Sequence, residues 1–324
     1  MANVLTVAGQ VAILFALMSV GAVLRRARLL ADAAVEGMVN LLILIVTPCI
    51  IVDVFQRPFS PSMLRSLGLA FVFAVAAHLL VIVFACLVVR HRDENVERPM
   101  RLAAVFSNAG FMGIPLEQAV LGDSGVFYGI VYVAVFNIFM WSWGLREMKS
   151  VELRGKSEGG RATAGRGIGW FDWKMVVNPG TVGIALGLPL FFLSVRLPEV
   201  VRAPVHHLAG LNTPLAMIVI GYYLIGARLG RVARQPVVYV ATAIRLVAYP
   251  LMVIAMMYPF RHGLDRSMML AITIGASAPV AAMVSMFATK FGRDVDTSVA
   301  VVSGSTLLSI VTMPPIIALA MAVL

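Results

Sequence analysis

Long apolar runs recur along this chain and constrain its fold more than any other feature of the sequence. An α-helix needs about twenty apolar residues to cross the hydrocarbon core of a bilayer. Runs of that length lie near residues 4–24, 34–55, 66–89, 102–121, 125–145, 175–195, 207–227, 236–257, 268–289 and 296–323. Because 60% of the residues are hydrophobic and only 13% are charged, the composition also exceeds what a soluble core requires. We therefore expect an all-α polytopic membrane protein with ten transmembrane helices.

Lysine and arginine residues are distributed unequally between the loops on the two sides of these spans. Alternate loops form two sets, and one set carries nineteen basic residues while the other carries six. By the positive-inside rule the richer set is cytoplasmic. An even number of spans then places both termini outside the cytoplasm. The basic residues are scattered and accompany no nucleic-acid motif, so no nucleic-acid partner is expected.

One connection is much longer than the others and divides the chain into two halves. Residues 146–174 are rich in Gly, Ser and charge, which predicts a flexible cytoplasmic linker between the five-span halves 1–145 and 175–324. Five is an odd number, so the second half enters the membrane in the opposite sense to the first. The expected architecture is two inverted five-helix repeats.

Matching residues in the two halves support this inverted repeat. They recur at nearly constant offsets of 166, 164 and 167 residues: Thr47-Pro48 with Thr213-Pro214, Pro115 with Pro279, and His78 with Arg245. Inverted repeats that contain paired broken helices are a signature of secondary transporters.

Span four carries residues that weaken a helix in the middle of the membrane. Gly110, Gly113 and Pro115 follow Asn108 within the stretch SNAGFMGIP. The pattern predicts a break at Gly110 to Gly113, with Pro115 in the first turn of a second half-helix, where proline is well tolerated. The alternative is that these residues only kink a packed helix.

Span nine repeats the device with Gly275, Ser277 and Pro279. Unwound backbone at this depth is stable only when it is buried in protein or lines an aqueous cavity. Two breaks that enter from opposite sides would bring two half-helix N-termini together. Their free N–H groups and partial positive charge suit an anion.

Ionisable residues at membrane depth are costly unless they are paired or hydrated. Arg245 lies near the centre of span eight and needs a partner: Glu117, Asp53 or a substrate carboxylate. Both a structural ion pair and a direct substrate or coupling role are open for it. For His78, a proton relay is weighed against a neutral, hydrogen-bonded core histidine, which is favoured. Asp53, close to the end of span two, is expected at a hydrated interface.

Catalytic and metal-binding motifs are missing from the sequence. It contains no HExxH, GxSxG or Walker A pattern, so a metalloprotease, a serine hydrolase or an ATP-driven pump has no support. Cys49 and Cys86 both lie in apolar segments and form no CxxC pair. We expect a protein that is not an enzyme and that binds no metal or cofactor.

Six segments, in order along the chain, resemble the auxin efflux carrier family, and in particular its bacterial members. They are SNAGFMGIPL, VYVAVFNIFMWSWG, VVNPGTVGIALGL, LNTPLAMIVIGYYLIGARL, ASAPVAAMVSMFATKFGRD and STLLSIVTMPPI. The resemblance extends over essentially the whole chain. It implies a location in the bacterial inner (plasma) membrane.

The resemblance also implies a fold like that of the bile acid sodium symporters. Spans 1, 2, 6 and 7 would form a scaffold, and spans 3–5 and 8–10 a transport domain with broken crossover helices 4 and 9. Carboxylate substrates would bind beside the crossing. Asn108 and Pro115 align with the family's first broken helix, Pro279 with the second, and Asn137 with a polar residue on span five near the site.

The function implied is secondary transport of small organic anions, mono- or dicarboxylates, by an elevator-type alternating-access mechanism. Symporters of bile acids have an acidic sodium ligand near the second crossing, whereas residues 277–282 contain no carboxylate. Proton coupling or uniport is therefore favoured over sodium coupling. A homodimer is the oligomer considered. The alternative function is a membrane receptor or regulatory module that binds a ligand without transporting it.

Overall fold

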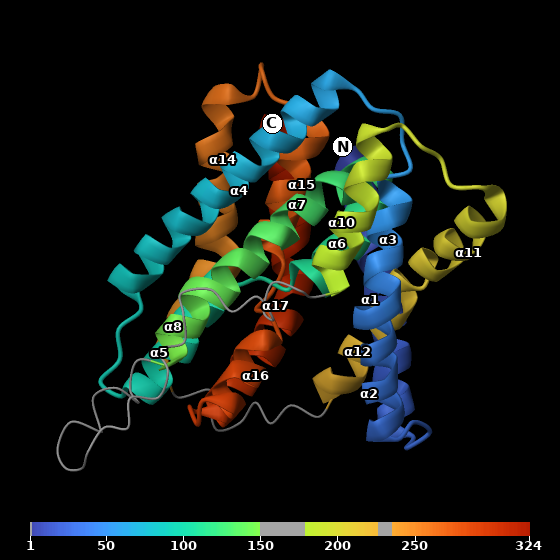
Figure 1. Ribbon diagram of the computed structural model, residues 1–324. Coiled ribbons are helices and arrows are strands. Elements are labelled where there is room, and N and C mark those ends of the chain that lie inside the picture. The colour runs from blue at the N-terminus through green and yellow to red at the C-terminus, as the bar shows by residue number, and fades with distance from the viewer. Residues whose placement is uncertain (1, 150–178, 226–234) are drawn as a thin grey trace, which may run out of the picture.

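The computed structural model describes residues 2–149, 179–225 and 235–324, and these ranges are helical apart from short connections (Figure 1). Most of the predicted linker, 146–174, lies outside the described residues. Its first four residues continue a helix that ends at Lys149, and the division of the chain into two halves around this linker stays a prediction.

The helices of the first half follow the predicted spans closely. In several of them, α-helical stretches are joined without interruption by a wider π-helical turn, labelled η. The elements are α1 (Ala2–Arg26), α2 (Asp32–Leu41), η1 (Leu42–Val46), α3 (Thr47–Val54), α4 (Pro61–Val88), α5 (Glu94–Val105), η2 (Ala109–Gly113), α6 (Ile114–Leu121), α7 (Asp123–Phe139), η3 (Met140–Gly144) and α8 (Leu145–Lys149).

The second half repeats this plan of long helices and short connections. Here η6 is a single 3₁₀ turn, and η5 is again a π-helical turn. The elements are α10 (Pro179–Phe192), α11 (Glu199–Gly210), α12 (Asn212–Ile225), α13 (Pro236–Ala243), η5 (Ile244–Ala248), α14 (Tyr249–Met257), η6 (Tyr258–Phe260), α15 (Arg266–Ser277), α16 (Met283–Lys290) and α17 (Val295–Val323).

Within the described residues, six helical stretches are both long enough and apolar enough to cross a membrane. They are Asp32–Val54, Pro61–Val88, Asp123–Lys149, Glu199–Ile225, Pro236–Phe260 and Val295–Val323. The expectation of an all-helical polytopic membrane protein is confirmed at this level, and the count of ten spans stays a prediction.

Three π-helical turns lie immediately before an X-Pro pair, at Thr47-Pro48, Ile114-Pro115 and Tyr249-Pro250. Proline cannot donate to the carbonyl four residues earlier, and its ring clashes with that carbonyl. A widened turn relieves the clash while the helix continues. In the first case the Thr47 hydroxyl compensates by donating to the carbonyl of Leu42, 2.8 Å away.

The helices form two groups. Figure 1 shows α1, α2, α3, α10, α11 and α12 on one side of the molecule and α4, α5, α8, α14 and α16 on the other. Within the first group, α1 and α12 approach so closely that a Cβ atom on Gly21 would overlap the backbone of Ile218. A Cβ on Gly221 would likewise overlap the backbone of Met18. Glycine at these two positions is therefore a condition of this packing.

A distinct apolar cluster lies where α1 and α12 of the first group meet α6 and α15, which belong to the interrupted helices. Met18 on α1 and Met217 on α12 contribute to it from one side, and Leu116 on α6 and Ile274 on α15 from the other. All four side chains are buried. Apart from Tyr222, the buried members of the cluster are aliphatic or methionine side chains, which pack without directional bonds.

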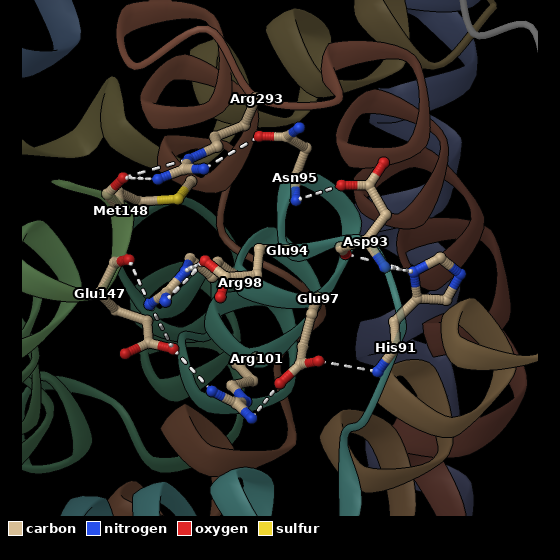
Figure 2. Close-up of polar contacts among 10 residues, drawn as sticks. All are labelled: His91, Asp93, Glu94, Asn95, Glu97, Arg98, Arg101, Glu147, Met148 and Arg293. Atoms are coloured by element: carbon tan, nitrogen blue, oxygen red, sulfur yellow. Dashed lines mark hydrogen bonds and ion pairs between the residues drawn. The ribbon is translucent and has the colours of Figure 1, made fainter. Parts of the chain in front are cut away.

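Polar contacts tie together the start of α5, the helix α8 and the residues that follow α16 (Figure 2). Arg98 lies 3.5 Å, and Arg101 3.0 Å, from the Glu147 carboxylate on α8. Arg293, just after α16, donates to the Met148 carbonyl and, over 2.9 Å, to the Asn95 amide oxygen. The cluster fixes the start of α5, the half-helix that leads to the first break.

Replacing Arg293 by glutamine is expected to lower the free energy of unfolding by about 1–3 kcal/mol, because a buried carbonyl then loses its charged donor. The thermal midpoint in detergent measures the effect. Arg146, which is exposed on α8, provides the matched control, and Arg146→Gln should leave the midpoint unchanged. Equal midpoints for the two variants would contradict this role of Arg293.

Candidate functional site

The two broken helices meet at their interruptions and pair with each other. Helix α5 ends at Val105, and the chain is extended until η2 begins at Ala109; helix α15 ends at Ser277, and α16 begins at Met283. The Asn108 N–H donates to the Pro279 carbonyl over 2.7 Å. In return, the Ala281 N–H donates to the Phe106 carbonyl over 3.0 Å. The unwound segments form a short antiparallel bridge that satisfies backbone groups away from water.

The prediction that span four breaks at Gly110 to Gly113 was wrong. The interruption covers Phe106 to Asn108, and the two glycines belong to the π-helical turn η2 that runs directly into α6. Pro115 does lie in the first turn of α6, as predicted. The helix opens where its backbone pairs with span nine. The glycines nearby give no local signal of that pairing, so the sequence pattern placed the break a few residues too late.

A serine on α17 supports the second interruption. The fully buried Ser305 hydroxyl accepts a hydrogen bond from the Val280 N–H over 3.1 Å. Donors in an unwound segment must find acceptors outside their own helix. The second interruption therefore also depends on α17, a helix that was not predicted to take part in the site.

Arg245 joins the ends of the two interrupted helices. Its guanidinium donates through Nη1 to the Val105 carbonyl over 2.7 Å and through Nη2 to the Ala276 carbonyl. These carbonyls lie in the last turns of α5 and α15, where intrahelical partners are lacking and the partial charge is negative. Arg245, with no exposed surface, thus caps two helix C-termini at once.

Neither of the two carboxyl side chains expected as partners of Arg245 pairs with it in the described part of the chain. Asp53 lies on α3, and its carboxylate is 2.9 Å from Nδ1 of His206 on α11. Glu117 makes no described hydrogen bond to the guanidinium. Only the N-terminal ends of half-helices were expected at the crossing. The C-terminal ends of α5 and α15 also lie there, and their carbonyl groups are the acceptors that a buried guanidinium needs.

Two tyrosines extend the polar network and were missed from the sequence. The Tyr132 and Tyr249 hydroxyl oxygens are 3.1 Å apart, and the Ser107 hydroxyl lies 3.5 Å from that of Tyr132. The Arg245 guanidinium lies over the Tyr249 ring, 4.4 Å from its centroid. Tyr249 follows Arg245 by four residues, so the i,i+4 spacing could have pointed to it; nothing local singles out Tyr132.

His78 is a buried core residue, in line with the favoured interpretation. Its Nδ1 lies 2.8 Å from the Ala74 carbonyl. A carbonyl can only accept, so Nδ1 carries the proton. The ring stacks on Phe139 with 5.4 Å between centroids. Packing and this single bond account for its orientation.

The open side of the crossing lies at Asn108 and Gly110. Asn108 is half-buried and its side chain makes no hydrogen bond within the described ranges. Gly110 is exposed, and a Cβ added to it would meet nothing within 4 Å. The first N–H groups of η2, at the start of this half-helix, have no intrahelical acceptor. A side-chain amide and free backbone donors therefore border open space at this point.

The remaining predicted residues contribute differently. Ser277 is fully buried and donates to the Thr273 carbonyl, and Pro279 takes part through its carbonyl. Asn137 is half-buried and donates to the Val133 carbonyl of its own helix over 2.9 Å. The crossing thus brings Asn108 and Pro279 together, whereas the polar groups of Ser277 and Asn137 are engaged within their helices.

Metal ligands are not clustered in the described part of the chain, where no group of three or more His, Cys, Asp and Glu side chains could hold an ion. Hydrogen-bond donors and helix ends are the groups that the crossing presents, and such groups bind anions reversibly.

Comparison with known proteins bears on the whole chain. A search of curated proteins found no match. The model of a family described as membrane transport protein matches residues 6–317, which is nearly the entire sequence and confirms the resemblance inferred from the six segments. That family is one of transporters, which fits an integral membrane protein that is not an enzyme. The chain belongs to the membrane transport protein family, the family of the auxin efflux carriers.

Proposed function

We propose that this transporter is a secondary carrier of small organic anions, mono- or dicarboxylates, with its site at the crossing of the two broken helices. The observation that carries the proposal is the open space beside Asn108 and Gly110, bordered by the start of a half-helix. Free N–H groups and the positive end of the helix favour a carboxylate there. Arg245 is engaged by two carbonyls and acts by holding the crossing together.

Several features support the arrangement as two inverted five-helix repeats. Interruptions fall in both predicted crossover helices, and the bridge between them pairs Ser107 with Val280. Proline follows a π-helical turn in spans two, four and eight. Both termini would lie outside the cytoplasm of a bacterial cell, on the inner membrane, in agreement with the loop charges.

The two groups of helices suggest how the site moves. The group with α1 and α12 corresponds to the expected scaffold of spans 1, 2, 6 and 7, and the other group to the transport domain. Apolar side chains fill the interface between them. Apolar contacts of this kind can slide without breaking directional bonds, which suits an elevator-type movement of the crossing. The hydrogen bond from Arg57, just after α3, to the Asp123 carbonyl on α7 would have to break in that movement.

Counterflow in liposomes tests the proposed function. Vesicles that contain the purified protein and a high internal concentration of malonate or malate should take up labelled external substrate transiently and saturably. A receptor would show saturable binding without uptake, and a channel would show uptake without counterflow. Absence of counterflow across a panel of small carboxylates and auxin-like acids would refute the proposal.

Asn108→Ala is expected to raise the KM for counterflow roughly tenfold, because one hydrogen bond to a charged ligand contributes about 1.5 kcal/mol. The backbone bridge does not involve the Asn108 side chain, so the thermal midpoint should stay unchanged. Asn40, exposed on α2, gives the control Asn40→Ala, with unaltered KM. An unaltered KM in Asn108→Ala would remove this side chain from the site.

A further inference from the structure

One carboxyl group in the interior has no role in the site described above. Glu117 lies on α6, just past the crossing, with 1% of its surface exposed. Its Oε2 atom is buried and has no hydrogen-bond partner in the described part of the chain. Buried carboxylates are ordinarily paired or multiply hydrogen-bonded, so this one calls for an explanation.

Glycines from three elements shape the space that holds this carboxyl. A Cβ on Gly129 of α7 would overlap the Glu117 carboxyl, and one on Gly113 of η2 would lie 3.8 Å from Oε1. Gly113 in turn packs against Gly275 of α15, with 3.5 Å from its added Cβ to the Cα of Gly275. We call the space bounded by Gly113, Gly129 and Gly275 the glycine slot. It leaves room for the acid but provides no charged partner.

The elements packed against α6 carry few groups that could neutralise a negative charge there. These elements are η2, α1, α7, α12 and α15. Their titratable and charged residues are Arg25 and Arg26 on α1, Asp123, Tyr128 and Tyr132 on α7, Tyr222 and Tyr223 on α12, and Arg266 on α15. Arg25 donates to the Tyr222 carbonyl and Arg266 to the Met321 carbonyl. Tyr132, the titratable group beside the slot, bonds through its hydroxyl to Tyr249.

These surroundings favour the protonated, neutral form of the Glu117 carboxyl. An ionised carboxylate in an apolar environment without a partner is strongly disfavoured, and the neutral acid avoids that cost. A sodium ion would need several oxygen ligands around it, and the glycines that line the slot supply no side-chain oxygen. Protonation removes the charge of the carboxyl without any further ligand.

We propose that Glu117 in the glycine slot is the proton-binding site that couples transport to a pH gradient, an inference that rests on the proposed transport function. The carboxylate takes up one proton while the slot is open to one side of the membrane. It crosses with the transport domain as a neutral acid and releases the same proton on the other side. One proton is bound and one released per cycle, with no other reactant.

The test separates proton coupling from transport itself. Wild-type protein in liposomes should accumulate labelled malonate under a pH gradient of one of the two signs, up to about tenfold per pH unit for one proton per malonate. Glu117→Gln, which mimics the neutral acid, should lose this accumulation and keep malonate counterflow without a gradient. Glu199→Gln, at an exposed ion pair on α11, should keep both.

Accumulation by Glu117→Gln that still follows the pH gradient would overturn the inference. So would wild-type accumulation that follows a sodium gradient and not a pH gradient. If wild-type protein shows no malonate counterflow at all, the proposed function fails for malonate, and infrared spectroscopy still tests the slot. A band of a protonated carboxylic acid should be present in wild-type protein at neutral pH and missing in Glu117→Gln.

A second variant, Glu117→Met, controls for the possibility that Glu117→Gln fails to fold. Glu117→Met places an apolar side chain of similar length in the slot, and it should fold with a thermal midpoint at or above that of wild type, because removing an unpaired buried acid relieves a desolvation cost. It should lack the infrared band as well. A band unchanged in both variants would show that Glu117 is not the protonated group.

Discussion

Replacing Arg245 by methionine is expected to lower the free energy of unfolding by roughly 2–6 kcal/mol, the cost of leaving two buried carbonyls without donors. The guanidinium reaches the Val105 and Ala276 carbonyls from one side chain, and both carbonyls are freed by the helix breaks. Without it, two negative helix ends face each other in an apolar interior. The thermal midpoint and the fraction of monodisperse protein in gel filtration measure the loss.

Arg245→Lys separates charge from geometry. A lysine ammonium is a compact charge that lacks the planar fork of arginine, so it should satisfy one carbonyl and recover only part of the stability. Arg202→Met, at an exposed pair with Glu199, should have no measurable effect. A wild-type midpoint for Arg245→Met would show that the caps contribute nothing.

Alanine at Gly21 and Gly221 together is expected to destabilise the protein by about 3 kcal/mol or more, since overpacking at each contact costs about 1–3 kcal/mol. Each added methyl group would overlap the backbone of the opposite helix, so α1 and α12 would have to separate. Thermal midpoints of the double variant and of each single variant measure the cost.

The same substitution elsewhere should act in the opposite direction. Gly9 on α1 and Gly37 on α2 have nothing within 4 Å of an added Cβ, and alanine is favoured over glycine in a helix by about 1 kcal/mol. Gly9→Ala and Gly37→Ala should therefore be neutral or stabilising. If all four substitutions shift the midpoint alike, the close approach of α1 and α12 is not a source of stability.

The sequence predicts the helical membrane class and the position of most spans, because twenty apolar residues in succession leave the chain few alternatives. Family membership also follows from short segments such as SNAGFMGIPL. Residues with a strong local signal, such as Pro115 at the start of α6, lie where they were expected.

Contacts between distant segments account for what the sequence did not reveal. The first helix opens at Phe106 to Asn108 because those groups pair with residues 279–281. Arg245 finds its partners in carbonyls that exist only because two helices are interrupted nearby. Both partners are ordinary backbone carbonyls, so no residue pattern in the sequence identifies them.

Movement of one group of helices against the other is the central claim, and the distance between spin labels on the two groups tests it most directly. In a Cys49→Ala, Cys86→Ala background, Val200→Cys on α11 and Met286→Cys on α16 would carry the labels. These side chains are 87% and 64% exposed. Leu87→Cys on α4, 66% exposed, paired with Met286→Cys provides a control within the proposed transport domain.

Pulsed electron paramagnetic resonance should show two distance populations for the 200–286 pair. Their ratio should change when a carboxylate that supports counterflow is added. The 87–286 pair should keep one distance throughout. A single, unchanged distribution for the 200–286 pair, with and without that carboxylate, would contradict the elevator-type movement of the crossing.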